Sequence, residues 1–375
     1  GYAPRAIDAE LSVAEETTLN TTLSAMRDGK GAIFVKSAGN DFDTDSNGLC
    51  GNSNSDGGLS CRDANQDSTH NNANAIVVSA LNADGSRASY STTGSAIWVS
   101  APGGEYGSSG AGGAPAIMTT DVQGCTNGYV GGGGDGANEF DSKSNPHGEN
   151  ANCNYMSTMN GTSSAAPNTS GVIALMLEAN PSLTMRDVKH ILATTSEQVD
   201  ASIAPVIVDG ITYHEWVVNE VGYTYHNYYG FGGIDATAAV NSAKSYTGGS
   251  LGAQSTLDWI STGTIDLDIG FGSTVTRAIN VPTAGTVEYV LVRLNLTHAD
   301  PSEVGFRLTS PSGTTTTIWQ PHVAVDTAVN GRDAYLSASA FYGESMAGEW
   351  ILSAYDHVNG NTMTLHSYEI QIKHR

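Results

Sequence analysis

The stretch Asn160–Pro167 (NGTSSAAP) is followed by the apolar run Gly171–Leu177 (GVIALML). This order predicts a loop that leads into a buried helix, with Ser163 in the first turn. An N–H group at a helix start has no partner within the helix, so it would point to the same place as the serine hydroxyl. A nucleophile beside a free N–H donor is what acyl transfer requires. The alternative is a Ser/Thr helix cap among small residues that allow close packing.

Composition bounds the class of protein. With 375 residues the chain is long enough for two domains, and 39% apolar residues can form packed cores. No stretch approaches the roughly 20 consecutive apolar residues of a membrane span. The 38 acidic and 16 basic residues give a net charge of −22, which argues against nucleic-acid binding. We therefore expect a soluble protein with neither a nucleic acid nor a membrane as its partner.

The four cysteines fall into two pairs along the chain, Cys50 with Cys61 and Cys125 with Cys153. Each pair brackets a loop of Gly, Asn and Ser that cannot bury a core, so a cross-link is an effective way to hold it. Neither pair has the short Cys-x-x-Cys spacing of a zinc site. We expect two local disulfides and a secreted or periplasmic protein, with free thiols as the alternative.

Strands and helices alternate through residues 1–247. Apolar strands are expected at Ala32–Lys36, Ala75–Leu81 and Ser95–Pro102, whereas residues 103–154 are largely loop, interrupted by Ala116–Asp121. Helical spacing is found at Ala14–Met26, after Ser163, at Thr184–Thr194 and at Ile234–Ser245. Thr184 and Asp187 have the spacing of a capping box at the start of the third helix. Continuous apolar strands between helices predict an α/β domain with a parallel sheet.

The pattern changes after residue 247. Residues 248–254 have the Gly- and Ser-rich composition of a linker. From residue 255 to residue 375 short alternating strands replace helical spacing, at Val275–Val281, Val287–Leu296, Gly305–Thr309, Trp350–Ala354 and Ser367–Ile372. Turn sequences separate these strands. The second domain is therefore expected to be an all-β, jelly-roll-like sandwich.

A second motif, Ser37–Asn40 (SAGN), ends the first expected strand. The Asn40 amide could donate to a developing oxyanion, although Asn is also common as a turn residue. Together with Ser163, this motif resembles the subtilisin-like serine proteases, and specifically their kexin/furin (proprotein convertase-like) branch. The resemblance implies Ser163 as the catalytic serine and Asn40 as the oxyanion donor. It also implies that the rest of the motif lines the first substrate pocket, namely Ser37, Ala38 and Gly39.

The resemblance spans essentially the whole chain. Leu177–Pro181 and Leu183–Val188 are similar to the helix pair that follows the nucleophile in this branch, and Tyr229–Gly232 is similar to the end of its catalytic domain. Residues 255–375, with Ser310–Thr314 and Gly348–Trp350, resemble the P domain that accompanies these catalytic domains. The implied fold is the C-terminal part of a subtilisin-like domain, followed by a P domain.

Asp67 is the candidate for substrate selectivity. It precedes the strand at Ala75, where the kexin branch carries an aspartate that pairs with a basic side chain at P1, the residue before the cleaved bond. A carboxylate at the base of a pocket would select Arg or Lys, because leaving either charge unpaired there is costly. The alternative is an ordinary loop aspartate in an acidic protein.

The resemblance also implies structural calcium at a site that the sequence does not locate. Residues Tyr90–Thr92 (YST) lack the calcium-ligating glutamate that the branch usually places after Tyr-Ser, so that site is not expected here. The acidic loop Asp41–Asp45 is another candidate, with a solvated loop as the alternative.

The catalytic base is the largest departure from the family pattern. The family places its catalytic Asp and His before the oxyanion Asn, but the 39 residues before Asn40 contain no histidine. His147, followed by glycine, is the nearest match to the His-Gly-Thr motif of the family, but it comes after Asn40. We expect His147 to be a surface residue. A serine without its base is a weak nucleophile.

The preferred hypothesis is therefore a secreted, kexin-like serine endopeptidase whose Asp and His lie on an upstream segment. A propeptide or chaperone is a candidate partner, besides a protein or peptide substrate. The alternative is a catalytically incomplete protein that serves binding or adhesion.

Overall fold

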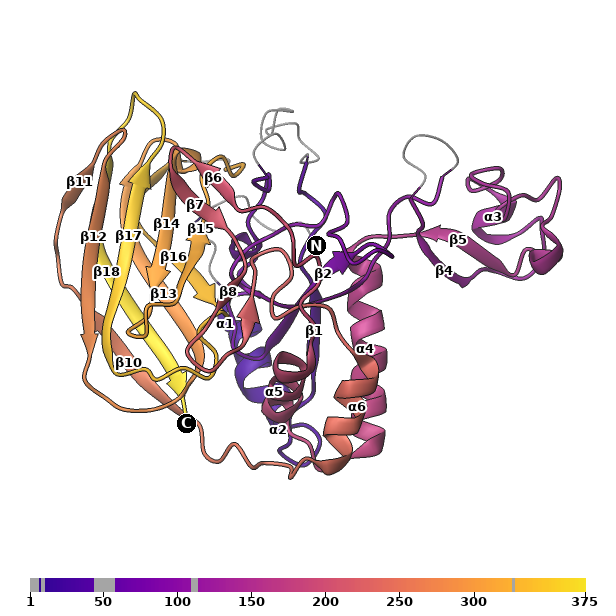
Figure 1. Cartoon of the computed structure of the whole chain (residues 1–375), viewed down its shortest axis with the longest axis horizontal. Coiled ribbons are helices and arrows are strands. Elements are labelled where there is room, and N and C mark those ends of the chain that lie inside the picture. The colour runs from indigo at the N-terminus through magenta and orange to yellow at the C-terminus, as the bar shows by residue number, and fades with distance from the viewer. Residues whose placement is uncertain (1–6, 8–10, 44–57, 109–113, 326–327) are drawn as a thin grey trace.

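Three parallel strands organise the first domain (Figure 1). The computed structural model describes residues 7, 11–43, 58–108, 114–325 and 328–375. The strands β1 (Phe34–Ser37), β2 (Ala75–Leu81) and β3 (Ile97–Pro102) lie in the order β1-β2-β3. β2 is buried throughout and β3 at all but its last residue, as expected for strands covered on both faces. β1 is only half-buried and pairs with β2 alone, so within the described chain its other edge is free.

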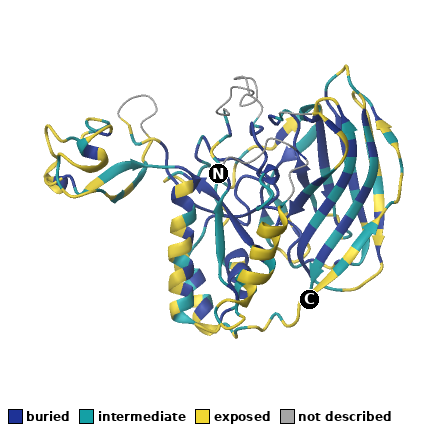
Figure 2. Cartoon of the chain, turned by 180° about the vertical axis from the view of Figure 1, so that it is seen from behind, coloured by how far each residue is buried: buried dark blue, intermediate teal, exposed yellow. Residues whose placement is uncertain are grey.

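The helix that carries Ser163 is α4 (Thr162–Ala179), which contacts all three strands. It buries Ala165, Ile173 and Met176 against the sheet, whereas Leu175 on the outer side is exposed (Figure 2). The prediction of a buried helix is therefore wrong for this outer side, which no described residue covers.

The remaining helices follow the sequence pattern. Along the chain they are α1 (Val13–Thr17), a π-helical stretch (Thr18–Thr22), α2 (Leu23–Ala25), α5 (Met185–Thr195) and α6 (Ala236–Ser245). The predicted capping box of α5 is confirmed, since the Thr184 N–H donates to the Asp187 carboxylate (2.8 Å) and the Asp187 N–H donates to the Thr184 hydroxyl (3.2 Å). This reciprocal pair places the start of α5 where the sequence puts it.

An arm projects from the first domain between β3 and α4 (Figure 1). It is built on the antiparallel pair β4 (Ile117–Thr120) and β5 (Tyr155–Met159) and also holds α3 (Gly128–Gly131). A disulfide between Cys125 and Cys153 closes the arm, as predicted. Cys61 is also disulfide-bonded, and its predicted partner, Cys50, lies outside the described residues.

The second domain, residues 255–375, is a sandwich of two antiparallel sheets (Figure 1). One sheet has the order β10-β18-β13-β16, with β11 also on β18, from the strands β10 (Ser255–Ser261), β11 (Leu267–Ile269), β13 (Val287–His298), β16 (Val329–Ala338) and β18 (Met363–His374). The other has the order β12-β17-β14-β15, from β12 (Thr274–Val281), β14 (Val304–Thr309), β15 (Thr315–Trp319) and β17 (Gly348–Asp356). Their inner faces enclose one apolar core, and the predicted all-β sandwich is confirmed.

Two short hairpins in the first domain were not expected from the sequence. They are β6 (Val206–Val208) with β7 (Ile211–His214) and β8 (Val217–Val218) with β9 (Thr224–Tyr225). The β7 strand lies against β15 of the second domain. The region therefore contributes to the contact between the domains.

Buried side-chain amides of the loop before β2 fasten the two domains together. Asn71 Nδ2 donates to the Tyr335 carbonyl (2.8 Å), and its Oδ1 accepts from the Ser337 N–H (3.0 Å). Asn65 Nδ2 donates to the Ile318 carbonyl (2.9 Å). Both asparagines are at least nine-tenths buried, so water could not replace a hydrogen-bond partner that either amide lost. We call Asn65 and Asn71 the amide clamp.

Removing one amide of this clamp should weaken the whole structure. We expect Asn71→Ala to lower the free energy of unfolding by about 2 to 4 kcal/mol, because the Tyr335 and Asn65 carbonyls lose a buried donor and the Ser337 N–H keeps only its bond to Asn65 Oδ1 (3.2 Å). Urea unfolding followed by circular dichroism measures this change. Asn241→Ala, at an exposed position on α6, is the matched control and should stay within about 0.5 kcal/mol. Equal stability of the two variants would contradict the role of the clamp.

Candidate active site

Asn40 joins the loop after β1 to the start of α4. Its Oδ1 accepts hydrogen bonds from the Thr162 N–H (2.9 Å) and from the Thr162 hydroxyl (2.8 Å). A main-chain N–H can only donate, so the oxygen end of the amide must face Thr162. The Nδ2 end therefore faces away, and no described residue accepts a hydrogen bond from it.

Gly161 keeps open the space that two free donors share. It precedes α4 with φ of 99°, a conformation that favours glycine. A Cβ atom at this position would lie 3.2 Å from Asn40 Nδ2 and 3.5 Å from Ser163 N. Both donors thus surround one point, where a substrate carbonyl oxygen could accept from the two together. This is the geometry of an oxyanion hole.

Thr92 holds the loop that carries Asn40. The sequence analysis singled it out only because it stands where the kexin branch usually has a calcium-ligating glutamate. Its hydroxyl accepts from the Asp41 N–H (3.0 Å), and its own N–H donates to the Gly39 carbonyl (3.0 Å). The Gly39 N–H in turn donates to the Thr162 hydroxyl (3.2 Å). These bonds fix the loop on both sides of Asn40. The sequence did not predict them, because the bonded residues lie far apart along the chain.

Tyr90 holds the loop that carries the nucleophile. Its hydroxyl accepts from the Gly161 N–H (2.7 Å) and donates to the Gly104 carbonyl. Burial raises the pKa of Tyr90 to about 12, so its hydroxyl keeps the proton that it donates. Tyr90 and Thr92 together position the two halves of the oxyanion hole.

Ser163 is exposed in the first turn of α4, at the mouth of this hole. Within the described chain its hydroxyl makes no hydrogen bond, although all ten histidines are described. His147 lies exposed in the arm, where its Nδ1 accepts from the Glu149 N–H (3.3 Å), and is the surface residue that was predicted. The candidate site therefore holds a serine nucleophile and two oxyanion donors, and no described residue serves as the base that would accept the serine proton.

The residues expected around the first substrate pocket lie beside this hole. Ser37 and Gly39 are half-buried, whereas Ala38 is buried and donates its N–H to the Val78 carbonyl (2.9 Å). Their place in the loop agrees with the resemblance, and their contact with substrate remains a prediction.

Asp67 has an internal partner that the sequence did not predict. Its carboxylate forms an ion pair with Lys36 of β1, whose ammonium also donates to the Thr69 hydroxyl (2.7 Å). His70 Nε2 lies 3.8 Å from the Asp67 carboxylate and 3.1 Å from the Ser37 carbonyl oxygen. The carboxylate therefore adjoins the SAGN motif through His70, and in this structure Lys36 neutralises it.

The charge state of Asp67 follows from these neighbours. Burial by itself would raise the pKa of Asp67, but the facing His70, Lys36 and Thr69 together lower it well below its ordinary value. The carboxylate is therefore ionised at neutral pH. Its assignment to a pocket for basic side chains remains a prediction.

Asp63 lies in the same segment. Its carboxyl is buried, and no described cationic side chain pairs with it. It caps the single turn Ala64–Gln66, since its Oδ1 accepts from the Asn65 N–H (2.9 Å) and its own N–H donates to the Gln66 side chain (3.0 Å). Burial raises the pKa of Asp63 to about 7, although N–H groups of Asn65 and Gln320 oppose the shift. The carboxyl thus holds a proton over a range in which an exposed aspartate is ionised.

Calcium was implied by the family resemblance alone. Among the described residues, no three His, Cys, Asp or Glu side chains are grouped to hold a metal ion. Asp41 and Asp43 of the candidate loop are described, whereas Asp45 lies outside the described residues. Calcium therefore stays a prediction, without ligands that this structure identifies.

A serine and an oxyanion asparagine on a parallel α/β sheet, followed by a β-sandwich, define the class of subtilisin-like proteases. A model described as the Subtilase family matches residues 9–260, and a model described as the Proprotein convertase P-domain matches residues 287–372. The chain belongs to the subtilase family and carries a P domain. In the described part of the chain, we find no helix with the length and apolar character of a membrane span.

Individual relatives agree with this assignment. The chain is 34% identical over 363 residues to an extracellular serine protease of Aeromonas sobria, which covers 88% of this chain and 56% of the relative. It is 32% identical over 207 residues to Furin-1 of Xenopus laevis, which covers 54% of this chain and 25% of the relative. The chain thus spans about half the length, or less, of these curated relatives.

Solved structures of the Aeromonas sobria serine protease share the whole fold. The crystal structure of the protease has a TM-score of 0.86 and 29% identity, covering 100% of this chain and 70% of the other. A second crystal structure, of the protease with a chaperone named ORF2, has a TM-score of 0.84 at the same identity and coverage.

The raised pKa of Asp63 predicts a pH dependence of stability. Because the folded-state pKa lies above that of the unfolded chain, near 3.9, only the folded state keeps this proton between about pH 4 and pH 7. This contribution to stability is complete below pH 4 and is lost as the pH rises through 7, on the order of 1 kcal/mol per pH unit.

Asp63→Asn should remove that contribution to the slope, as measured by urea unfolding at a series of pH values. Asp258→Asn, at an exposed position on β10, is the matched control and should keep the wild-type slope. An unchanged slope in Asp63→Asn would show that Asp63 is ionised in the folded protein.

Proposed function

We propose that this chain belongs to a secreted, kexin-like serine endopeptidase that works through an acyl-enzyme. The observation that carries the proposal is the single point faced by Asn40 Nδ2 and the Ser163 N–H, beside the exposed Ser163 hydroxyl. Ser163 Oγ bonds to the carbonyl carbon of the substrate, and the carbonyl oxygen becomes an oxyanion that accepts from both donors. The C–N bond then breaks as the base returns the Ser163 proton to the leaving amine, and water hydrolyses the acyl-enzyme to a carboxylic acid and free Ser163.

The base that takes the proton of Ser163 comes from a segment outside this chain, together with its Asp. Two observations support this proposal besides the unpartnered hydroxyl. Among the described residues, one edge of β1 has no partner strand although the neighbouring β2 is fully buried, and the outer side of α4 is uncovered although it carries Leu175. Further strands and helices of a subtilisin-like domain would cover both surfaces.

Cleavage after basic residues is supported by the ionised carboxylate of Asp67, which adjoins His70, the residue that contacts the Ser37 carbonyl. Lys36 occupies this carboxylate, so a basic P1 side chain has to displace the Lys36 ammonium or share the carboxylate with it. Lys36 therefore acts as an internal competitor of the substrate, which lowers the advantage of Arg and Lys over neutral side chains.

Secretion, or export to the periplasm, is supported by the disulfide between Cys125 and Cys153, a bond typical of oxidising compartments. The similar protein of Aeromonas sobria is named as extracellular, and its crystal structure with a chaperone supports a chaperone or propeptide partner here. The substrate class that fits an exposed nucleophile of this kind is a protein or peptide.

Labelling with a fluorophosphonate tests the catalytic assignment in the native protein that carries this chain. We expect an adduct on Ser163, found by peptide mass spectrometry and absent in Ser163→Ala. Asn40→Ala should slow labelling and peptide hydrolysis by about 100- to 1,000-fold, because one oxyanion donor is lost. Asn241→Ala should leave both rates unchanged. No adduct in the native protein would contradict the protease assignment and favour the binding protein that has lost its base.

Variants of the Lys36–Asp67 pair test the specificity. Asp67→Asn should lower kcat/KM for substrates with Arg at P1 by about 100-fold or more and leave those with Leu at P1 nearly unchanged. Lys36→Met should lower KM for Arg substrates about tenfold, because the competitor is gone, while kcat stays similar. Equal changes for the Arg and Leu substrates in both variants would place Asp67 outside the substrate pocket.

A further inference from the structure

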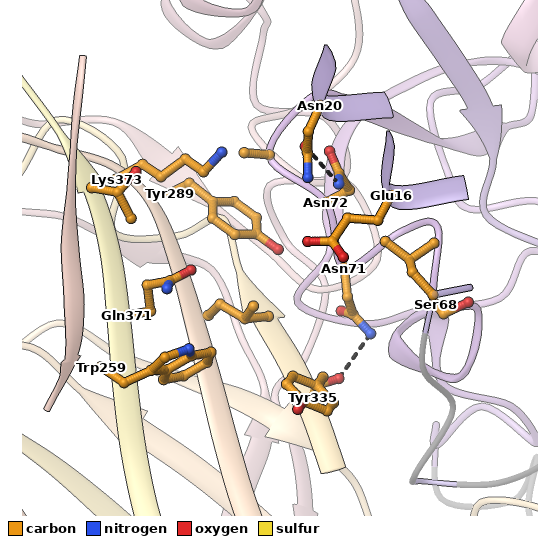
Figure 3. A pocket seen from close by; sticks show the side chains of 14 residues that line it. Glu16, Asn20, Ser68, Asn71, Asn72, Trp259, Tyr289, Tyr335, Gln371 and Lys373 are labelled. Carbon is orange, nitrogen blue, oxygen red and sulfur yellow. Dashed lines mark hydrogen bonds between the residues drawn. The ribbon is translucent and has the colours of Figure 1, made fainter. Parts of the chain in front are cut away.

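A separate pocket of about 440 Å³ lies at the seam between the two domains (Figure 3). It shares no residue with the oxyanion hole. One wall is the outer face of the β10-β18-β13-β16 sheet of the P domain, and the other is the α1 region with the loop before β2. The volume is in the range of pockets that hold small organic ligands.

The wall from the P domain is an aromatic platform. Trp259 of β10 and Tyr335 of β16 are half-buried and lie with their ring centres 6.3 Å apart at an angle of 69°. The Arg293 guanidinium lies 4.8 Å from the centre of the Trp259 ring and is itself paired with Glu369. The indole is therefore held in place before any ligand arrives.

Polar groups with few protein partners surround this platform. The Tyr289 hydroxyl is buried and forms no hydrogen bond of good geometry among the described residues, although it interacts with the Ser337 side chain, and Figure 3 shows it directed into the pocket. The side chains of Gln371, Lys373 and Glu16 also line the pocket, and in the described chain none of them makes a hydrogen bond. A buried hydroxyl without a hydrogen bond of good geometry is costly, so the pocket is built to satisfy it with something else.

The chemistry of the lining excludes several ligand classes. Glu16 and Lys373 line the pocket with opposite charges that interact with each other, so the lining has no excess of positive charge to bind an anion such as a nucleotide. The many polar groups oppose an acyl chain. An extended peptide pairs its main chain with the edge of a sheet, whereas this wall is the face of a sheet whose main-chain groups pair with neighbouring strands.

What fits is a neutral ring with an apolar face and several hydroxyl groups. We propose that this pocket binds a short neutral saccharide. A sugar ring stacks on Trp259, and its hydroxyls pair with Tyr289, Gln371 and the Glu16 carboxylate. Double-sheet jelly-roll sandwiches also occur as lectin domains, an analogy of fold alone. The site would add recognition of a glycan to the proposed proteolytic function and does not depend on it.

A panel of four disaccharides, maltose, cellobiose, lactose and N,N′-diacetylchitobiose, tests the proposal with the protein that carries this chain. Saturation-transfer NMR and isothermal titration calorimetry are the readouts. We expect at least one disaccharide to bind with a Kd in the millimolar range or below. Trp259→Ala should weaken this binding more than tenfold, and Tyr289→Phe should weaken it about five- to tenfold, as for one lost hydrogen bond.

Two controls make the result decisive. Phe271→Ala removes an exposed aromatic side chain of the same domain outside the pocket, and it should leave the binding unchanged. Tyr289→Phe removes one hydroxyl that forms no hydrogen bond of good geometry in the described chain, and an unfolding midpoint equal to that of the wild type shows that weakened binding is not due to misfolding. No binding of any of the four disaccharides at tens of millimolar overturns the proposal, as does binding that persists in Trp259→Ala. Fluorophosphonate labelling of Ser163 is measured separately, so failure here is distinct from failure of the proposed catalysis.

Discussion

The candidate active site depends on the side-chain amide of Asn40, whose oxygen and nitrogen face different partners. The acceptor end of Asn40 is occupied by the N–H and the hydroxyl of Thr162, so its donor end has to face the space beside Ser163. Because Thr162 is the first residue of α4, the same contact sets the distance between the end of β1 and the nucleophile. Gly161 completes the arrangement by leaving empty the point that both donors face. The oxyanion hole is therefore formed before substrate binds, which is the condition under which such donors are most effective.

The P domain is continuous with this site through hydrogen bonds and ion pairs. Its main chain at Tyr335 and Ser337 holds Asn71, which lies next to His70. His70 in turn contacts both Asp67 and the Ser37 carbonyl, at the start of the SAGN motif. The loop that carries the candidate selectivity residue is thus packed between the substrate side of the first domain and the sheet of the second. This arrangement explains why its amides and the Asp63 carboxyl are buried although the loop contains only a single helical turn.

Much of the fold could be predicted from local order in the sequence. The bounds of β2, the capping box of α5, the disulfide of the arm and the change to an all-β domain follow from apolar runs, caps, cysteine positions and turn residues. Other features could not be predicted this way. β10, β15 and β16 were missed because they contain many polar residues, and Thr92 and Tyr90 were missed because their partners are distant in sequence. The outer side of α4 was wrongly expected to be buried, since its apolar residues say nothing about whether a neighbour is present.

The sequence by itself predicted that Ser163 and Asn40 belong to one site, because their motifs resemble the nucleophile motif and the oxyanion motif of a single protease family. Only the tertiary structure decided which charges meet. Lys36 and Asp67 lie on different elements, and their ion pair gives the candidate selectivity carboxylate a cationic partner that the sequence did not predict. The same holds for the pocket at the seam, where residues from both ends of the chain come together. Ion pairs and pockets depend on distances between segments, and the order of residues along one segment does not contain those distances.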